Sequence, residues 1–205
     1  MDEQRLILAS ASARRRALLT QVCPAFDVQP CPYAEPQRKS AKVPPRQWVE
    51  AVAYFKARGV AERCPRRWVL GADTIIVCAG ELLGKPRDRD DARRMLDLQA
   101  RAASEVLTGV CLVRMDSDPQ RVSAADVTRV WMHDDPAARE TYLRTGDWQG
   151  KAGAYGIQDV GDRLIARIEG SFSNVVGLPL ELVARMLRSV GVLAGPASDE
   201  RVPPA

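Results

Sequence analysis

Histidine is almost absent from this chain of 205 residues, since His133 is the only one. A histidine-rich metal site is therefore excluded, and a bound metal would be a hard cation held by carboxylates and phosphates. The five cysteines, at positions 23, 31, 64, 78 and 111, form an odd number and include no CxxC pair. This pattern indicates reduced thiols and argues against a disulfide framework or a zinc site.

Long apolar runs are also missing, because no stretch approaches 18 uninterrupted apolar residues, the length typical of a membrane-spanning helix. The first residues, MDEQR, lack the basic and then apolar pattern of a signal peptide. We therefore expect a cytoplasmic protein with no membrane partner. The net charge of +4 is too small to indicate a chain that wraps nucleic acid.

The order of the expected elements indicates an α/β fold. Apolar runs bounded by turn residues predict strands at about 6–9, 26–29, 103–114, 121–133 and 163–170. Residues 68–86 predict two further strands joined by a turn at Ala79-Gly80. Helical spacing and capping residues predict helices after residue 12, at 46–61, at 88–99, from 136 onward and at 178–190. Residues 30–47 hold five prolines and predict an irregular loop.

Strands and helices do not alternate in the regular way of a doubly wound sheet. We therefore expect a mixed sheet flanked by helices, arranged as two lobes with a central cleft. Residues 1–194 form one expected domain, and the polar, proline-containing residues 195–205 are expected to be a disordered tail.

The segment LILASASARRRALL, near the start of the chain, runs from apolar residues through two serines into three arginines (14–16). It predicts a buried strand, a tight turn holding Ser10 and Ser12, and a helix. Cations in the first turn oppose the helix dipole unless an anion lies there. Backbone N–H groups, hydroxyls and guanidinium groups together suit a phosphate, although a solvated basic helix face is an equally good explanation.

Asp73, in VLGADTII, is the most informative carboxylate. A charge inside a buried strand costs several kcal/mol unless a metal, a cation or hydrogen bonds compensate it. A structural bond to the neighbouring backbone or to an arginine is the simpler explanation. Glu35 in the proline-rich loop, Lys56 on a helix and Lys85 in a Gly-Lys-Pro turn carry little information individually.

Seven segments together resemble the Maf family of nucleotide pyrophosphatases. They are LASASARRR, FKA, VLGADT, ELLGKP, EVLTGV, KAGAYGIQ and GSFSNVVGLPLE, and they extend over about residues 6–190. The segment AYGIQ is similar to that of family members acting on dTTP and UTP. The resemblance implies a Maf/ITPase-like fold, a homodimer, and hydrolysis of a nucleoside triphosphate to the monophosphate and pyrophosphate with Mg²⁺ or Mn²⁺.

The resemblance also implies the roles of particular side chains. By position in the motifs, the phosphate-binding residues are Ser10, Ser12, Arg14, Arg15, Lys56 and Lys85. Asp73 takes the position of the proton acceptor, and a metal ligand that orients the attacking water would fit the same position. Glu35 takes that of a metal-associated carboxylate, whereas Arg16 falls outside the matched arginine pair.

Recognition of the base is expected to involve Gln158 and Thr74. A glutamine amide offers one donor and one acceptor, which can pair with two adjacent groups on the edge of uracil or thymine. The alternatives are a purine triphosphate such as 7-methyl-GTP as substrate, or a regulator of septum formation without catalytic activity. Because Asp73, Glu35 and the cations are all present, we favour the enzyme.

Overall fold

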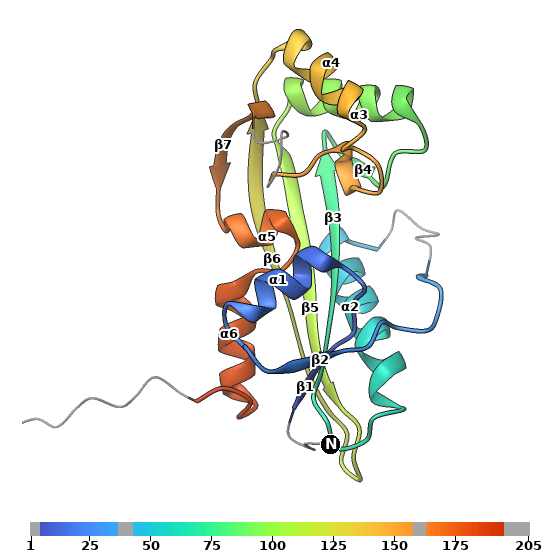
Figure 1. Cartoon of the computed structure of the whole chain (residues 1–205), viewed down its shortest axis with the longest axis vertical. Helices are drawn as coiled ribbons and strands as arrows, with labels where there is room; N and C mark the ends of the chain where they lie inside the picture. Colours follow the sequence, from blue (N-terminus) through green and yellow to red (C-terminus); the bar gives the residue numbers. More distant parts are fainter. Residues whose placement is uncertain (1–4, 37–42, 158–162, 195–205) are drawn as a thin grey trace, which may run out of the picture.

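The computed structural model describes residues 5–36, 43–157 and 163–194 (Figure 1). Its centre is a seven-stranded mixed sheet in the order β2-β1-β3-β5-β6-β7, with β4 paired to β3. The strands are β1 (Leu6–Leu8), β2 (Phe26–Val28), β3 (Val69–Cys78), β4 (Glu81–Leu83), β5 (Ser104–Arg114), β6 (Gln120–Met132) and β7 (Ile165–Glu169). The predicted mixed α/β architecture is confirmed.

The helices are α1 (Ala13–Thr20), α2 (Pro45–Ala61), α3 (Arg89–Arg101), α4 (Pro136–Thr145), α5 (Phe172–Val176) and α6 (Leu180–Ser189), with a 3₁₀ turn η1 (Ala152–Ala154). The sequence did not predict α5 or η1. Where the sequence predicts the first or last residue of a helix or strand, the structure agrees within two residues. The expected disordered tail lies outside the described residues. None of the described helices combines the length and apolar character needed to cross a membrane.

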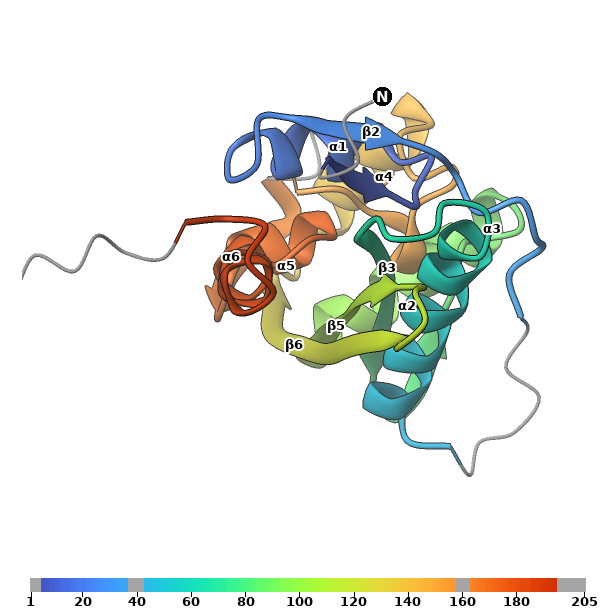
Figure 2. The same cartoon turned by 90° about the horizontal axis from the view of Figure 1, so that it is seen from below.

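Three long antiparallel strands, β3, β5 and β6, run through the length of the molecule (Figure 1). The helices α3 and α4 lie at one end of these strands, and β1, β2, α1, α2 and α6 lie toward the other. Figure 2 shows α2 and α6 on opposite sides of the long strands. Each end has its own buried apolar clusters, and the partly buried Ile165 and Val175 pack against a cluster of each end.

The edge of β3 is interrupted in its middle. On one side β3 pairs with β5 from Val69 to Cys78. On the other side it pairs with β1 at Val69 and Leu70 and with β4 from Ile76 to Cys78. In the described part of the chain, no strand pairs with residues 72–75 on that side, so the backbone of this short stretch has a strand partner only on the side of β5.

Two glycines allow α2 to lie directly on the sheet. A Cβ added to Gly71 would lie 2.2 Å from the carbonyl oxygen of Ala53, and one added to Gly109 would lie 2.4 Å from that of Val49. Both distances are impossible for real carbon and oxygen atoms, so α2 can approach β3 and β5 this closely only because these residues have no side chain. The position of Lys56 on α2 relative to Asp73 on β3 depends on this contact.

We expect Gly71→Ala to push α2 away from the sheet. The methyl group has only backbone to displace, and such overpacking costs about 1–3 kcal/mol of unfolding free energy, measurable by urea denaturation. Gly84→Ala is the matched control, because a Cβ there meets nothing within 4 Å and should change stability by less than about 0.5 kcal/mol. Equal stability of the two variants would contradict the proposed role of the contact.

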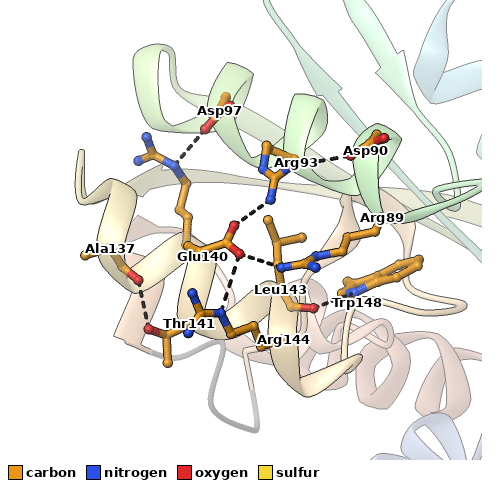
Figure 3. A network of polar contacts seen from close by, with 11 residues as sticks. Arg89, Asp90, Arg93, Asp97, Ala137, Glu140, Thr141, Leu143, Arg144 and Trp148 are labelled. Atoms are coloured by element: carbon orange, nitrogen blue, oxygen red, sulfur yellow. Dashed lines mark hydrogen bonds and ion pairs between the residues drawn. The ribbon is translucent and has the colours of Figure 1, made fainter.

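In the other lobe, an ion-pair network joins α3 to α4. Figure 3 shows the carboxylate of Glu140 among Arg89 and Arg93 from α3 and Arg144 from its own helix. The hydrogen bond from Arg93 lowers the pKa of Glu140, and the charges of the three arginines lower it further, while burial opposes the shift. The ionised carboxylate therefore stabilises the packing of these two helices.

This network should make stability depend on pH. Because the folded-state pKa of Glu140 is lowered, its contribution is complete above the pKa of the unfolded state, about 4.3, and is lost as the pH falls through the folded-state value. We expect Glu140→Gln to lower the thermal midpoint at pH 7, and to differ less from the original protein at pH 3. Asp90→Asn removes a carboxylate with one 3.4 Å contact and a 92% exposed side chain, so its midpoint should change little at either pH.

Candidate active site

A cleft of about 1230 Å³ opens beside the interrupted edge of β3. One lobe lines it with the turn before α1, the loop after β2 and the side of α2. The other lobe contributes the segment around Gly84 and residues 150–157, and residues 175–177 close one end. Six of the seven segments that resemble known motifs contribute residues to the lining of this cleft. The seventh, EVLTGV, lies on β5 and pairs with β3.

The start of α1 faces the cleft with its N–H groups and hydroxyls. Ser12 is the N-cap, and its Oγ accepts from the backbone N–H of Arg15 at 3.4 Å. Ser10 is 7% exposed, and its Oγ accepts from the N–H of Ser12 at 3.2 Å. The helix has no acidic residue in its first turn. The positive end of the helix dipole therefore remains available to an anion.

Arg15 points from α1 across the end of the cleft. Its Nε donates to the carbonyl oxygen of Gly177 at 2.9 Å, and its Nη2 donates to Oγ1 of Thr74 at 3.0 Å. Nη1 lies 3.5 Å from Oγ of Ser10. Burial lowers the pKa of the Arg15 guanidinium, whereas the negative charges of Asp73 and Glu35 oppose this shift. An arginine remains protonated in such surroundings, so the cleft holds an oriented positive charge.

Asp73 and Glu35 share one cation. The Nζ of Lys56 lies 2.8 Å from Oδ1 of Asp73 and 2.7 Å from Oε1 of Glu35. The side chains of Lys56 and Asp73 are 8% and 13% exposed, and that of Glu35 is 62% exposed. Burial acts to raise the pKa of Glu35, but the hydrogen bond and charge of Lys56, with weaker help from Lys85 and Arg15, lower it overall. Both carboxylates therefore converge on a single point of positive charge.

Thr74 lies on the opposite face of β3 from Asp73, because successive side chains of a strand alternate. Asp73 lies on the side of α2, and Thr74 lies on the side of α1 and α5. The Oγ1 of Thr74 accepts from Arg15 and lies 3.0 Å from Oγ1 of Thr108 on β5. In this structure, Thr74 holds the guanidinium in place.

Positive charge exceeds negative charge in the cleft. Among the described residues that line it, five side chains are cationic and two are carboxylates. The cations are Arg14, Arg15, Lys56, Lys85 and Lys151, and the carboxylates are Glu35 and Asp73. A cleft with this balance attracts a polyanion, and preorganised hydrogen-bond donors stabilise the negative charge of such a ligand.

Comparison with known proteins identifies the family of this chain. The family described as "Maf-like protein" matches residues 5–190. The chain belongs to the Maf family. It is 44% identical to a "dTTP/UTP pyrophosphatase" of Moorella thermoacetica over 92% of this chain and 96% of that protein. A protein of the same name from Anaeromyxobacter dehalogenans is 46% identical, over 91% and 94% of the two chains.

Among solved structures, this Maf chain is similar in fold to a HAM1 protein from Coxiella burnetii. The TM-score is 0.51 with 13% sequence identity, over 91% of this chain and 99% of that one. At this identity the likeness concerns the fold alone. The predicted Maf/ITPase-like architecture is thereby supported, independently of any single motif.

The two carboxylates fit a hard divalent cation. Within the described ranges, no group of three or more His, Cys, Asp and Glu side chains could hold a metal. Asp73 and Glu35 nevertheless already surround one cation, the ammonium of Lys56. Mg²⁺ is commonly bound by one or two protein carboxylates together with waters and substrate phosphates. The donor set of this Maf protein is of that kind.

Most residues singled out in the sequence line this cleft. They are Ser10, Ser12, Arg14, Arg15, Glu35, Lys56, Asp73, Thr74 and Lys85. Gln158 lies outside the described residues, and its expected contact with the base stays a prediction. Lys151 also lines the cleft but was not predicted as a site residue. Its position directly before the Gly-rich segment AGAYG could have indicated it. Nor was Thr108 singled out, whose hydroxyl lies 3.0 Å from that of Thr74 behind the cleft wall.

The three consecutive arginines should differ in their effect on substrate. Arg14 and Arg15 line the cleft, whereas Arg16 is exposed and does not line it. We expect Arg14→Ala and Arg15→Ala to lower kcat/KM for a nucleoside triphosphate by about 10- to 100-fold, since each removes a charge-assisted hydrogen bond. Arg16→Ala is the matched control and should change kcat/KM less than about twofold. Equal and small effects at all three positions would identify the run as a solvated helix face.

Proposed function

We propose that this Maf protein hydrolyses dTTP and UTP to the monophosphate and pyrophosphate. The observation that carries the proposal is the convergence of Asp73, Arg15 and Lys56 at the interrupted edge of β3, beside the N-terminus of a helix. The relatives at 44% and 46% identity are both named for this activity, and they are matched over nearly the whole chain. Hydrolysis would break the bond between the α- and β-phosphates.

The chain supplies positioning and charge for this reaction. Arg14, Arg15 and the first N–H groups of α1 bind the phosphate tail, and Lys85 adds charge from the other lobe. Phosphoryl transfer depends mainly on such positioning and on neutralising the phosphate charge. Asp73 would accept a proton from the attacking water, and its location in the cleft with limited exposure supports this role.

A divalent metal, Mg²⁺ or Mn²⁺, is part of the proposal. When bound, such a metal shields phosphate charge and lowers the pKa of coordinated water. Asp73 and Glu35 are the residues that would hold it, with the triphosphate completing the oxygen ligands. Lys56 would then exchange its two carboxylate partners for a phosphate oxygen, the role expected for it from the sequence.

Several further features are proposed on the family resemblance and on the modest net charge of +4. They are a preference for pyrimidine bases read by Gln158, a homodimer, a cytoplasmic location and the absence of a nucleic-acid partner. Light scattering of the purified protein tests the dimer. A mass corresponding to one chain at micromolar concentration would contradict it.

The central test is the identity of the products. Purified protein is incubated with dTTP, UTP, CTP, GTP and 7-methyl-GTP, with Mg²⁺, with Mn²⁺ and with a chelator. We expect monophosphate and pyrophosphate from dTTP and UTP only when a metal is present. Orthophosphate and diphosphate as products would contradict the proposed bond, and a faster reaction with 7-methyl-GTP would overturn the proposed substrate class. Absence of hydrolysis of every nucleotide would favour a regulator of septum formation.

Asp73→Asn should reduce turnover by about 10²- to 10⁴-fold, the usual loss when a positioned base or metal-orienting carboxylate is removed. The measurement is the rate of pyrophosphate release. Asp27→Asn is the matched control, because Asp27 on β2 is also paired with a basic side chain, Arg67, but does not line the cleft. A folded Asp73→Asn protein with a normal rate would remove Asp73 from the mechanism.

A further inference from the structure

A chain of hydrogen bonds leads from Arg15 into the core of the protein. Arg15 Nη2 lies 3.0 Å from Thr74 Oγ1, which lies 3.0 Å from Thr108 Oγ1. Thr108 Oγ1 in turn lies 3.2 Å from the backbone carbonyl oxygen of Asn174. Thr74 and Thr108 are directly opposite each other in the antiparallel pairing of β3 and β5. The chain therefore crosses from the cleft wall to α5, through a residue that is completely buried.

The donor and acceptor at the two ends of this series of hydrogen bonds fix which hydroxyl donates to which. A guanidinium can only donate, and a carbonyl oxygen can only accept. Thr74 therefore accepts from Arg15 and donates to Thr108, and Thr108 donates to the carbonyl of Asn174. A chain of hydroxyls aligned in one direction is strengthened by mutual polarisation. Removing one hydroxyl from its middle leaves its neighbour without the acceptor on which this alignment depends.

The side chain of Asn174 fixes the carbonyl at the end of the chain. It is fully buried, and its Nδ2 donates to the carbonyl oxygen of Val106 on β5 and to Oγ1 of Thr128 on β6, both at 2.9 Å. Thr128 Oγ1 also accepts from the N–H of Ser171 and donates to its carbonyl oxygen. These bonds attach the short helix α5 to two strands of the sheet.

The second contact of Arg15 depends on the same helix. Gly177 ends α5 with φ at +123°, and its N–H donates to the carbonyl of Asn174 at 3.0 Å. The carbonyl of Gly177 then accepts from Nε of Arg15 at 2.9 Å. Nε and Nη2 of the guanidinium are thus oriented by groups that Asn174 and Thr108 hold in place.

We propose that Thr108 and Asn174 are positioning residues for triphosphate binding, and that they act by fixing the orientation of Arg15 in the cleft. The proposal rests on the proposed function in taking a nucleoside triphosphate as the ligand. Thr108 and Asn174 do not touch the substrate in this proposal. If Thr108 is replaced by valine, the acceptor left for the Thr74 proton is the carbonyl of Gly177 at 3.5 Å, which Arg15 already uses. The guanidinium then loses its single fixed orientation.

The test is the affinity for a non-hydrolysable UTP analogue, measured by calorimetry, together with kcat/KM for UTP. We expect Thr108→Val to raise the dissociation constant about three- to tenfold, the effect of one buried hydrogen bond. Thr108→Ser keeps the hydroxyl and should bind within about twofold of the original protein. Asn174→Ala should weaken binding at least as much as Thr108→Val, provided that circular dichroism shows the same secondary structure.

A control separates positioning from general stability. Ser104→Ala removes another buried hydroxyl from the same strand, one that donates to Gln99 Oε1 at 3.2 Å far from Arg15. It should cost similar thermal stability but leave the affinity unchanged. Loss of affinity in Ser104→Ala equal to that in Thr108→Val would overturn the proposal, because stability alone would then explain both.

A double-mutant cycle completes the test. When Arg15 is already alanine, Thr108→Val should change the dissociation constant less than about twofold, since its effect passes through Arg15. Additive effects of the two substitutions would contradict the proposal. The binding measurement needs no turnover, so it gives this result even if the wild-type protein releases no pyrophosphate, an outcome that would refute the proposed function instead.

Discussion

The gap in the edge of β3 is the constraint on which the rest of the site depends. A strand in the middle of a sheet has hydrogen-bonded neighbours on both sides, which leave no room for a ligand beside its backbone. Here β1 and β4 each pair with a different end of β3, and between them Asp73 and Thr74 line the cleft without a strand partner on that side. Asp73 and Thr74 therefore combine the rigidity of a central strand, given by β5, with access from the cleft. Rigid positioning of this kind favours a catalytic carboxylate.

Because side chains alternate along β3, its two faces carry different polar groups. On the side of α2, Lys56 connects Asp73 to Glu35, and the close approach of that helix requires glycine at positions 71 and 109. On the side of α1, Thr74 accepts a hydrogen bond from Arg15. The carboxylates thus remain on one face and the guanidinium on the other. This separation keeps Arg15 from pairing directly with Asp73, which would neutralise both groups.

Much of this arrangement could be predicted from the sequence, because β3, β5, β6 and α2 are long elements with strong periodicity. The resemblance to the Maf motifs also brought Asp73, Glu35 and the cations together. The short helix α5 was missed, since FSNVV has too few residues to show a helical period. Thr108 was missed for a different reason. Its role arises from standing opposite Thr74, and strand register cannot be read from either segment alone.

The hydrogen bond between Arg15 and Gly177 joins residues 162 positions apart in the chain. A nascent chain emerging from the ribosome therefore completes its first three strands and α2 long before the carbonyl that orients Arg15 has been synthesised. Contacts of such long range form late in folding, because the entropy of closing the loop must first be overcome. A chain truncated before α5 would retain all seven strands of the sheet but lack the Gly177 carbonyl that accepts from Arg15. The hydrogen bond that orients Nε of Arg15 is thus formed only when nearly the whole chain is in place.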